Sequence, residues 1–112
     1  MNFKLALRRA AQGDRIAHMA ARGSASFDEV DDMCAARALC DDVLQQHAIG
    51  AAGSRVAALA AWIQCAVREF ECGATEIALP GQLRDTLRDV GEELRDSAEN
   101  ELDRLALGQL KR

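Results

Sequence analysis

Residues 83–105, LRDTLRDVGEELRDSAENELDRL, decide the fold class of this 112-residue chain. The apolar positions in and around this stretch are Leu83, Leu87, Val90, Leu94, Ala98, Leu102 and Leu105. Their steps of three or four residues are the spacing of one face of an α-helix. Eleven residues separate Leu83 from Leu94 and Leu94 from Leu105, and such a period gives about 3.67 residues per turn, close to a straight helix. The stretch therefore predicts a long amphipathic helix in a compact bundle, not a coiled-coil rod.

The other segments have the same periodicity, and together they predict a single all-α domain, residues 1–112, with about four helices. The expected helices cover about residues 2–21, 26–48, 54–72 and 80–107. Ser26 and Glu29 have the spacing of a capping box at the start of the second helix, and Pro80 fits the first turn of the fourth. We expect the apolar stripes of the third and fourth helices to dock as an antiparallel pair.

Each of the first three helices also has an apolar stripe. On the first helix, Phe3, Leu7, Ala10, Ala17 and Ala21 share one face, and Gly13 marks a position at which this helix could kink or split. The stripe of the second is Val30, Met33, Ala36, Cys40 and Leu44, with His47 at its end. The stripe of the third is Val56, Leu59, Ile63, Ala66 and Phe70. Residues 74–79 are expected to form an ordered connector that packs down through Ile77 and Leu79.

The composition predicts a core that buries little apolar area, and it favours self-association of the chain. Apolar residues make up 49% of the chain but aromatic residues only 4%, so the core is built from Leu, Val and many Ala. Alanine lets helices approach closely but buries little area. Self-association would add the missing burial, and we therefore expect a homodimer.

The charged residues indicate a source and argue against one class of partner. Arginine outnumbers lysine 12 to 2, and together with the high alanine content this bias is typical of a GC-rich genome. We therefore expect a bacterial or phage protein. The net charge of −4 is mild and does not favour a general nucleic-acid binder.

The chain has no pattern typical of a membrane span or an export signal. Its longest uninterrupted apolar run, residues 56–63, is far below the roughly 18 residues that a span needs. Residues 1–22 are rich in arginine and poor in acidic residues, as in an amphipathic presequence, but a folded first helix is the favoured interpretation. The four cysteines, Cys34, Cys40, Cys65 and Cys72, are expected as reduced thiols. These features predict a cytoplasmic protein.

Lys4, Arg8, Arg15 and Arg22 form a candidate basic face on the first helix, because steps of four and seven residues keep them on one side. Residues 1–25 carry five positive charges and one negative, whereas residues 26–47 carry six negative and one positive. Three interpretations remain open. The basic face could bind an anionic partner or ligand, it could pair with the acidic second helix of the same chain, or the two patches could meet between subunits.

Trp62, Cys65, Glu69 and Cys72 form a candidate interface, because they lie away from the apolar stripe of the third helix. A helix that is apolar on two sides is either central in its bundle or covered by another chain. Tryptophan is also enriched among the residues that dominate interface energies. Burial within the monomer, a subunit or partner interface, and a ligand pocket remain open.

No group of residues predicts a catalytic, cofactor or metal site. The chain has no CxxC, HxxxH or ExxH pair of the kinds that bind zinc or iron, and two histidines cannot supply the usual ligands. It has no glycine-rich phosphate loop either. A DNA-reading helix needs Arg, Asn or Gln where the third helix offers Val56, Ala57 and Leu59.

These patterns favour a non-enzymatic protein-binding module. We expect a small regulator, inhibitor or adaptor that acts on another protein through a helical face and associates with itself. A modulator of a host protein, encoded by a phage or an accessory element, would fit such a short chain. The alternative is a regulator that responds to a ligand or a nucleic acid through the basic face of the first helix.

Overall fold

Four α-helices and a short two-stranded ribbon make up the described part of the chain, residues 2–46 and 52–110 of a computed structural model. The helices are α1 (Phe3–Arg22), α2 (Val30–Gln46), α3 (Ala52–Glu71) and α4 (Gly81–Leu110). A turn of 3-10 helix, η1 (Phe27–Glu29), leads into α2, and the strands are β1 (Ser24–Ser26) and β2 (Glu76–Ala78). The predicted all-α fold is confirmed, and the helices lie close to their predicted bounds.

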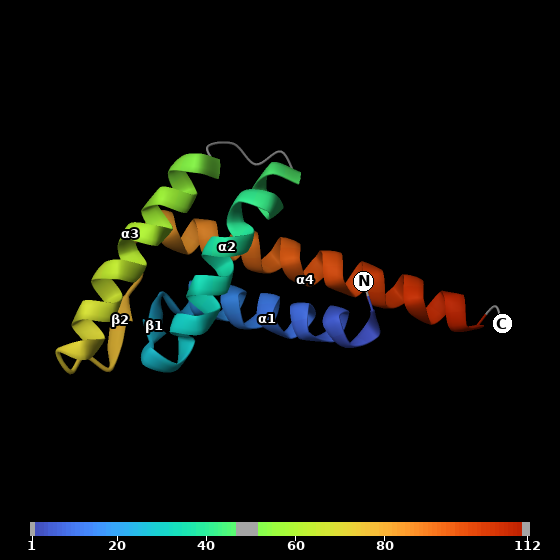
Figure 1. Ribbon diagram of the computed structural model, residues 1–112, viewed down its shortest axis with the longest axis horizontal. Helices are drawn as coiled ribbons and strands as arrows, with labels where there is room; N and C mark the ends of the chain where they lie inside the picture. The colour runs from blue at the N-terminus through green and yellow to red at the C-terminus, as the bar shows by residue number, and fades with distance from the viewer. Residues whose placement is uncertain (1, 47–51, 111–112) are drawn as a thin grey trace.

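Helices α1 and α4 lie side by side, run in opposite directions and form the most extensive contact among the described elements (Figure 1). Helix α3 packs on α4 as expected, over a shorter stretch, and α2 packs on α3 and α4. The main partner of α4 is thus α1. The 30 residues of α4 set the longest dimension, and the molecule measures 56 × 29 × 20 Å.

Two glycines explain why α1 can pack so closely on α4. Gly13 and Gly91 are buried where the two helices meet. A Cβ atom at Gly13 would lie 2.6 Å from the backbone nitrogen of Arg95, and one at Gly91 would lie 2.6 Å from that of Ala17. Only a residue without a side chain permits this approach of one backbone to another. Helix α1 continues through Gly13 as one element, so it does not split there.

The buried face of α1 differs from the stripe expected for it. Its buried residues are Ala6, Gly13, Ile16, Met19 and Ala20, whereas Phe3 and Leu7 of the expected stripe are 50% and 47% exposed. The reason is that α1 has two neighbours, α4 and α2. The buried side of α1 therefore includes the small residues that face α4, and also Ile16 and Met19, which pack in the common core.

The stripes of the other helices are confirmed where side chains are described. Leu87 and Val90 of α4 are fully buried, and Leu83, Leu94 and Ala98 are nearly so, whereas Leu102 and Leu105 are half-buried. Met33, Ala36 and Cys40 of α2 and Leu59, Ala66 and Phe70 of α3 are buried. Val30, Val56 and Ile63 are half-buried. The side chains of Leu44 and His47, also expected in this core, lie outside the described residues.

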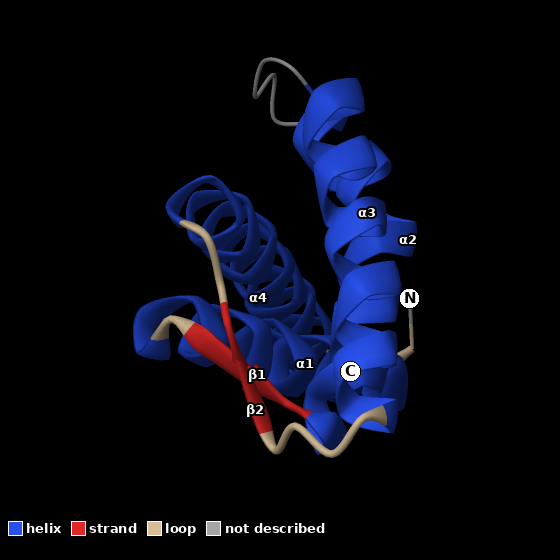
Figure 2. Cartoon of the chain, turned by 90° about the vertical axis from the view of Figure 1, so that its left-hand side faces the viewer, coloured by secondary structure: helices blue, strands red, loops and turns tan. Residues whose placement is uncertain are grey.

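The connector before α4 forms a strand, which the sequence pattern does not predict. Strand β2 pairs with β1 in antiparallel register, Ile77 opposite Ala25 (Figure 2). Ile77 is half-buried and Leu79 is buried, as expected for a connector that packs down. The backbone N–H of Leu79 then donates to the carbonyl of Gly23 at 2.9 Å. The ribbon therefore joins the end of α1 to the start of α4.

Gly23 and Arg84 close the C-terminal end of α1. Gly23 has the left-handed φ of 81° that favours glycine after a helix, and its N–H donates to the carbonyl of Met19. The Arg84 guanidinium of α4 donates to the carbonyls of Ala20 at 3.0 Å and Ala21 at 3.3 Å. These carbonyls have no partner within their own helix, so Arg84 links the two main helices.

Candidate interaction surfaces

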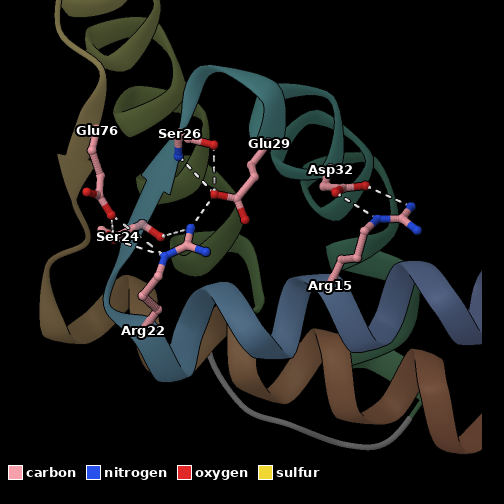
Figure 3. Close-up of polar contacts among 7 residues, drawn as sticks. All are labelled: Arg15, Arg22, Ser24, Ser26, Glu29, Asp32 and Glu76. Carbon is pink, nitrogen blue, oxygen red and sulfur yellow. Dashed lines mark hydrogen bonds and ion pairs between the residues drawn. The ribbon is translucent and has the colours of Figure 1, made fainter.

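Two residues of the candidate basic face pair with acidic residues of the same chain. Arg15 donates from Nε and Nη2 to the two carboxylate oxygens of Asp32, at 3.0 and 3.1 Å (Figure 3). This two-pronged geometry is the strong form of an arginine–carboxylate pair. The hydrogen bond to Asp32 raises the pKa of Arg15 above its ordinary value. Arg15 is therefore held against α2.

Arg22 is the centre of a polar cluster at the end of α1 (Figure 3). Its Nε donates to the Ser24 hydroxyl at 3.1 Å, and its Nη2 donates to the Ser24 carbonyl at 2.8 Å. It forms an ion pair with Glu29 and lies 3.7 Å from a Glu76 carboxylate oxygen. Ser24 also donates to Glu76. Arg22 thus connects α1, the ribbon and η1.

The Glu29 carboxylate completes the capping box that the sequence predicts. It accepts hydrogen bonds from the backbone N–H of Ser26 at 2.9 Å and from its hydroxyl at 3.0 Å. Burial alone would raise the pKa of Glu29, but the hydrogen bonds from Ser26 and Arg22 outweigh it and lower this pKa below its ordinary value. The cluster is therefore held in its charged form and stabilises the local fold.

The remaining residues of the basic face point to solvent. Lys4 and Arg8 are exposed, and within the part of the chain that the structure describes neither makes a hydrogen bond or ion pair. Arg8 and its neighbour Arg9 line an open groove of about 460 Å³. Its other lining residues are Leu5, Ala11, Gln12, Arg15 and Leu39. The basic face is thus divided into a paired half and a solvated half.

The candidate interface on α3 is divided too. Trp62 is half-buried against the core, and its indole N–H lies 3.4 Å from the carbonyl oxygen of Ala78. Cys65 and Glu69 are exposed on the outside of α3, and Cys72 is exposed in the turn that follows this helix. Part of the tryptophan surface is therefore used within the chain. Whether the outside of α3 binds another chain stays a prediction.

A third surface emerges from the structure, and we call it the open face. It is the side of the α1–α4 pair that α2 and α3 leave uncovered (Figure 2). On α1 it carries the apolar stripe Phe3, Leu7, Ala10, Ala17 and Ala21. Ala17 and Ala21 also line a groove of about 360 Å³, to which α4 contributes charged residues of both signs, Arg84, Asp85, Arg88 and Glu92. The apolar stripe of α1 is the signal for this surface in the sequence, but a stripe alone does not show whether it is buried within the chain.

The acidic and cysteine side chains show no sign of a metal centre within residues 2–46 and 52–110. There, no three His, Cys, Asp or Glu residues come together in a group that would hold a metal ion. His18, the histidine of α1, is exposed.

Within residues 2–46 and 52–110, no helix has both the length and the apolar character that crossing a membrane requires.

Comparisons with known proteins found no matching family model, no matching curated protein and no matching solved structure. Function therefore has to be inferred from the residues of this chain.

Proposed function

We propose that this protein is a non-enzymatic protein-binding module that acts through a helical face. The observation that carries the proposal is the open face. Phe3 and Leu7 expose about half of their surfaces there, 50% and 47%. Asp14, ion-paired with Arg95, separates them from Ala17 and Ala21, which line the groove together with charged residues of α4. Exposed apolar side chains bordered by charged residues are typical of a protein-binding surface. A small regulator, inhibitor or adaptor would use such a surface.

Site-specific photo-crosslinking in the native host tests this proposal. A photoreactive amino acid is placed at Leu7 on the open face, at Glu69 on the outside of α3, or at Leu5. Leu5 is the matched control, because it is a leucine of the same helix with 38% exposure but lies on the other side of α1. We expect discrete protein adducts from Leu7 and none from Leu5.

The other two outcomes are equally informative. Adducts from Glu69 alone would keep the protein-binding function and move it to the candidate interface on α3. If none of the three positions formed protein adducts, the proposal of a protein-binding module would be wrong.

One observation favours a second function, a regulator that binds an anionic ligand or nucleic acid. The solvated half of the basic face, with Lys4, Arg8 and the neighbouring Arg9, lies beside the groove that also contains Leu5 and Leu39. Arginine side chains bind carboxylate and phosphate groups well. A salt series discriminates the two functions, because binding of nucleic acid weakens steeply as salt rises.

A further inference from the structure

We infer that the groove between α1 and α2 binds a small organic anion with a carboxylate or phosphate head and a short apolar tail. Residues of α1 between Leu5 and Arg15 line this groove together with Leu39 of α2, and we call it the α1–α2 groove. Such binding rests on the second function proposed above and names the class of its ligand. The volume of about 460 Å³ lies within the roughly 300–1,000 Å³ that is common for small-molecule sites.

The charged residues that line the α1–α2 groove are all basic. They are Arg8, Arg9 and Arg15, and no acidic side chain is among its described lining residues. Two other grooves of the molecule differ in this respect. The groove on the open face has arginines and carboxylates together, and so has the groove lined by Asp14 and Glu29. Of these three grooves, the α1–α2 groove is therefore the one whose lining favours an anion.

Two of the three arginines are available to a ligand. Arg8 is exposed and Arg9 is half-buried, and neither makes a hydrogen bond or ion pair among the residues that the structure describes. Arg15 differs, because the Asp32 carboxylate accepts hydrogen bonds from its Nε and Nη2 at 3.0 and 3.1 Å (Figure 3). Asp32 thus offsets the charge of Arg15 and fixes its position. The unbalanced charge of the groove comes from Arg8 and Arg9.

The mixture of side chains selects an anion that also has an apolar part. The guanidinium groups of Arg8 and Arg9 suit a carboxylate or a phosphate, each of which can accept two parallel hydrogen bonds. Leu5, which is 38% exposed, and the half-buried Leu39 offer apolar surface to a tail. A nucleic acid would be repelled along its length by the net charge of −4. A small ligand with a single anionic group avoids most of this repulsion.

Titration of the isotope-labelled full chain, followed by two-dimensional NMR, tests this binding. Hexanoate and hexyl phosphate supply the two heads on one tail, hexanol has the tail without charge, and inorganic phosphate has the charge without a tail. We expect at least one of the two hexyl anions to shift the amide signals of Leu5, Gln12 and Leu39, with a dissociation constant of about 1 mM or lower. Hexanol and phosphate are expected to bind at least about tenfold more weakly, because each makes only part of the contacts.

Charge-matched variants make the test specific for the groove. Arg8→Gln with Arg9→Gln removes its unbalanced charge and is expected to weaken binding of the hexyl anion at least about tenfold. Arg37→Gln with Arg68→Gln is the matched control. It changes the net charge by the same amount, at exposed arginines of α2 and α3 that do not line the groove, and is expected to bind as the wild type does. Circular dichroism checks that both variants fold.

A pair of leucine variants tests the apolar part of the groove. Leu5→Gln makes one of its walls polar and is expected to weaken the hexyl anion at least about threefold. Leu7→Gln is the control, because Leu7 is an exposed leucine of the same helix but does not line the α1–α2 groove. It is expected to leave the affinity unchanged.

Three results would overturn this assignment of a ligand. These are no signal shifts with either hexyl anion, hexanol binding as tightly as the anions, and an affinity that Arg8→Gln with Arg9→Gln lowers no more than the control does. Protein adducts from a photoreactive residue at Leu5 would also reject it, because a segment of another protein would then occupy the groove. The second function fails separately. Oligonucleotide binding without binding of either hexyl anion would keep a regulator that responds to an anion and reject only the small ligand.

Discussion

At single residues, the structure makes its sharpest predictions at Gly13 and Gly91. Gly13→Ala and Gly91→Ala are each expected to lower the free energy of unfolding by about 1–3 kcal/mol. The new Cβ would lie 2.6 Å from a backbone nitrogen of the facing helix, so α1 and α4 must separate. This cost exceeds the gain of about 1 kcal/mol that alanine brings over glycine inside a helix. Denaturant melts measure the difference.

Gly108→Ala is the matched control for these variants. Gly108 is also in α4, but a Cβ there would meet nothing within 4 Å. We expect this variant to gain up to about 1 kcal/mol, since only the helix preference of alanine remains. If Gly13→Ala stabilised the protein as Gly108→Ala does, the close approach of the two helices would be wrong.

Glu29 should make the stability of the protein depend on acid pH. The pKa of Glu29 is lowered in the folded state, so the unfolded chain binds the proton more readily. Its contribution is then complete above the unfolded pKa of about 4.3 and is lost as the pH falls through the lower folded pKa. We expect Glu29→Gln to be less stable than the wild type at pH 7 and to lose less stability on acidification.

Thermal melts between pH 7 and pH 3 measure this effect, with Glu71→Gln as the control at an exposed glutamate of α3. The control is expected to follow the wild-type profile. A Glu29→Gln profile parallel to that of the wild type over the whole range would show that the capping box does not carry the pH dependence.

At the scale of elements, α4 shows what periodicity predicts well. Its stripe depends on spacing within one helix, and Leu87 is fully buried as expected. Leu87→Ala is therefore expected to cost about 2–4 kcal/mol. Ser97→Ala, off the stripe and exposed, should be nearly neutral. Denaturant melts that showed Ser97→Ala to be the more costly of the two would reject the register of this helix.

Elements that depend on distant partners could not be predicted in the same way. The capping box of Ser26 and Glu29 is visible because both residues lie in one turn. Strand β2 pairs with Ser24–Ser26, whose residues lie 50 to 54 positions earlier than their partners, and three residues are too few to show the alternation of a strand. The pairing of α1 with α4 depends on Gly13 and Gly91, whose common position is set only by the tertiary fold.

The candidate sites show the same limit. The sequence indicates that the basic first helix could form ion pairs with the acidic second helix. It does not show that Asp32 pairs with Arg15 whereas Arg8 remains exposed. The apolar stripe with Phe3 and Leu7 was visible too. Which side of α1 would be covered depends on where α2 packs, and that is a property of the whole molecule. The sequence therefore shows the stripe but not that α2 and α3 leave it uncovered.

At the scale of the whole molecule, the distribution of charge argues against nucleic acid as the main partner. The net charge is −4, and Arg15 and Arg22 are neutralised by Asp32 and Glu29. Lys4 and Arg8 stay exposed, but α4 alone carries eight acidic residues against four basic ones. A phosphate backbone attracted to Lys4 and Arg8 would also be repelled by the net negative charge of the chain, and this repulsion offsets the attraction.

We therefore expect no binding of single- or double-stranded oligonucleotides below about 10 μM at about 150 mM salt, tighter than the usual non-specific range. Fluorescence anisotropy measures it. Lys4→Glu with Arg8→Glu is the test variant, and Arg37→Glu, at an exposed arginine of α2, is the control. Sub-micromolar binding that falls steeply with salt and is lost only in the test variant would favour the second function, because only the solvated half of the basic face could then hold the phosphates.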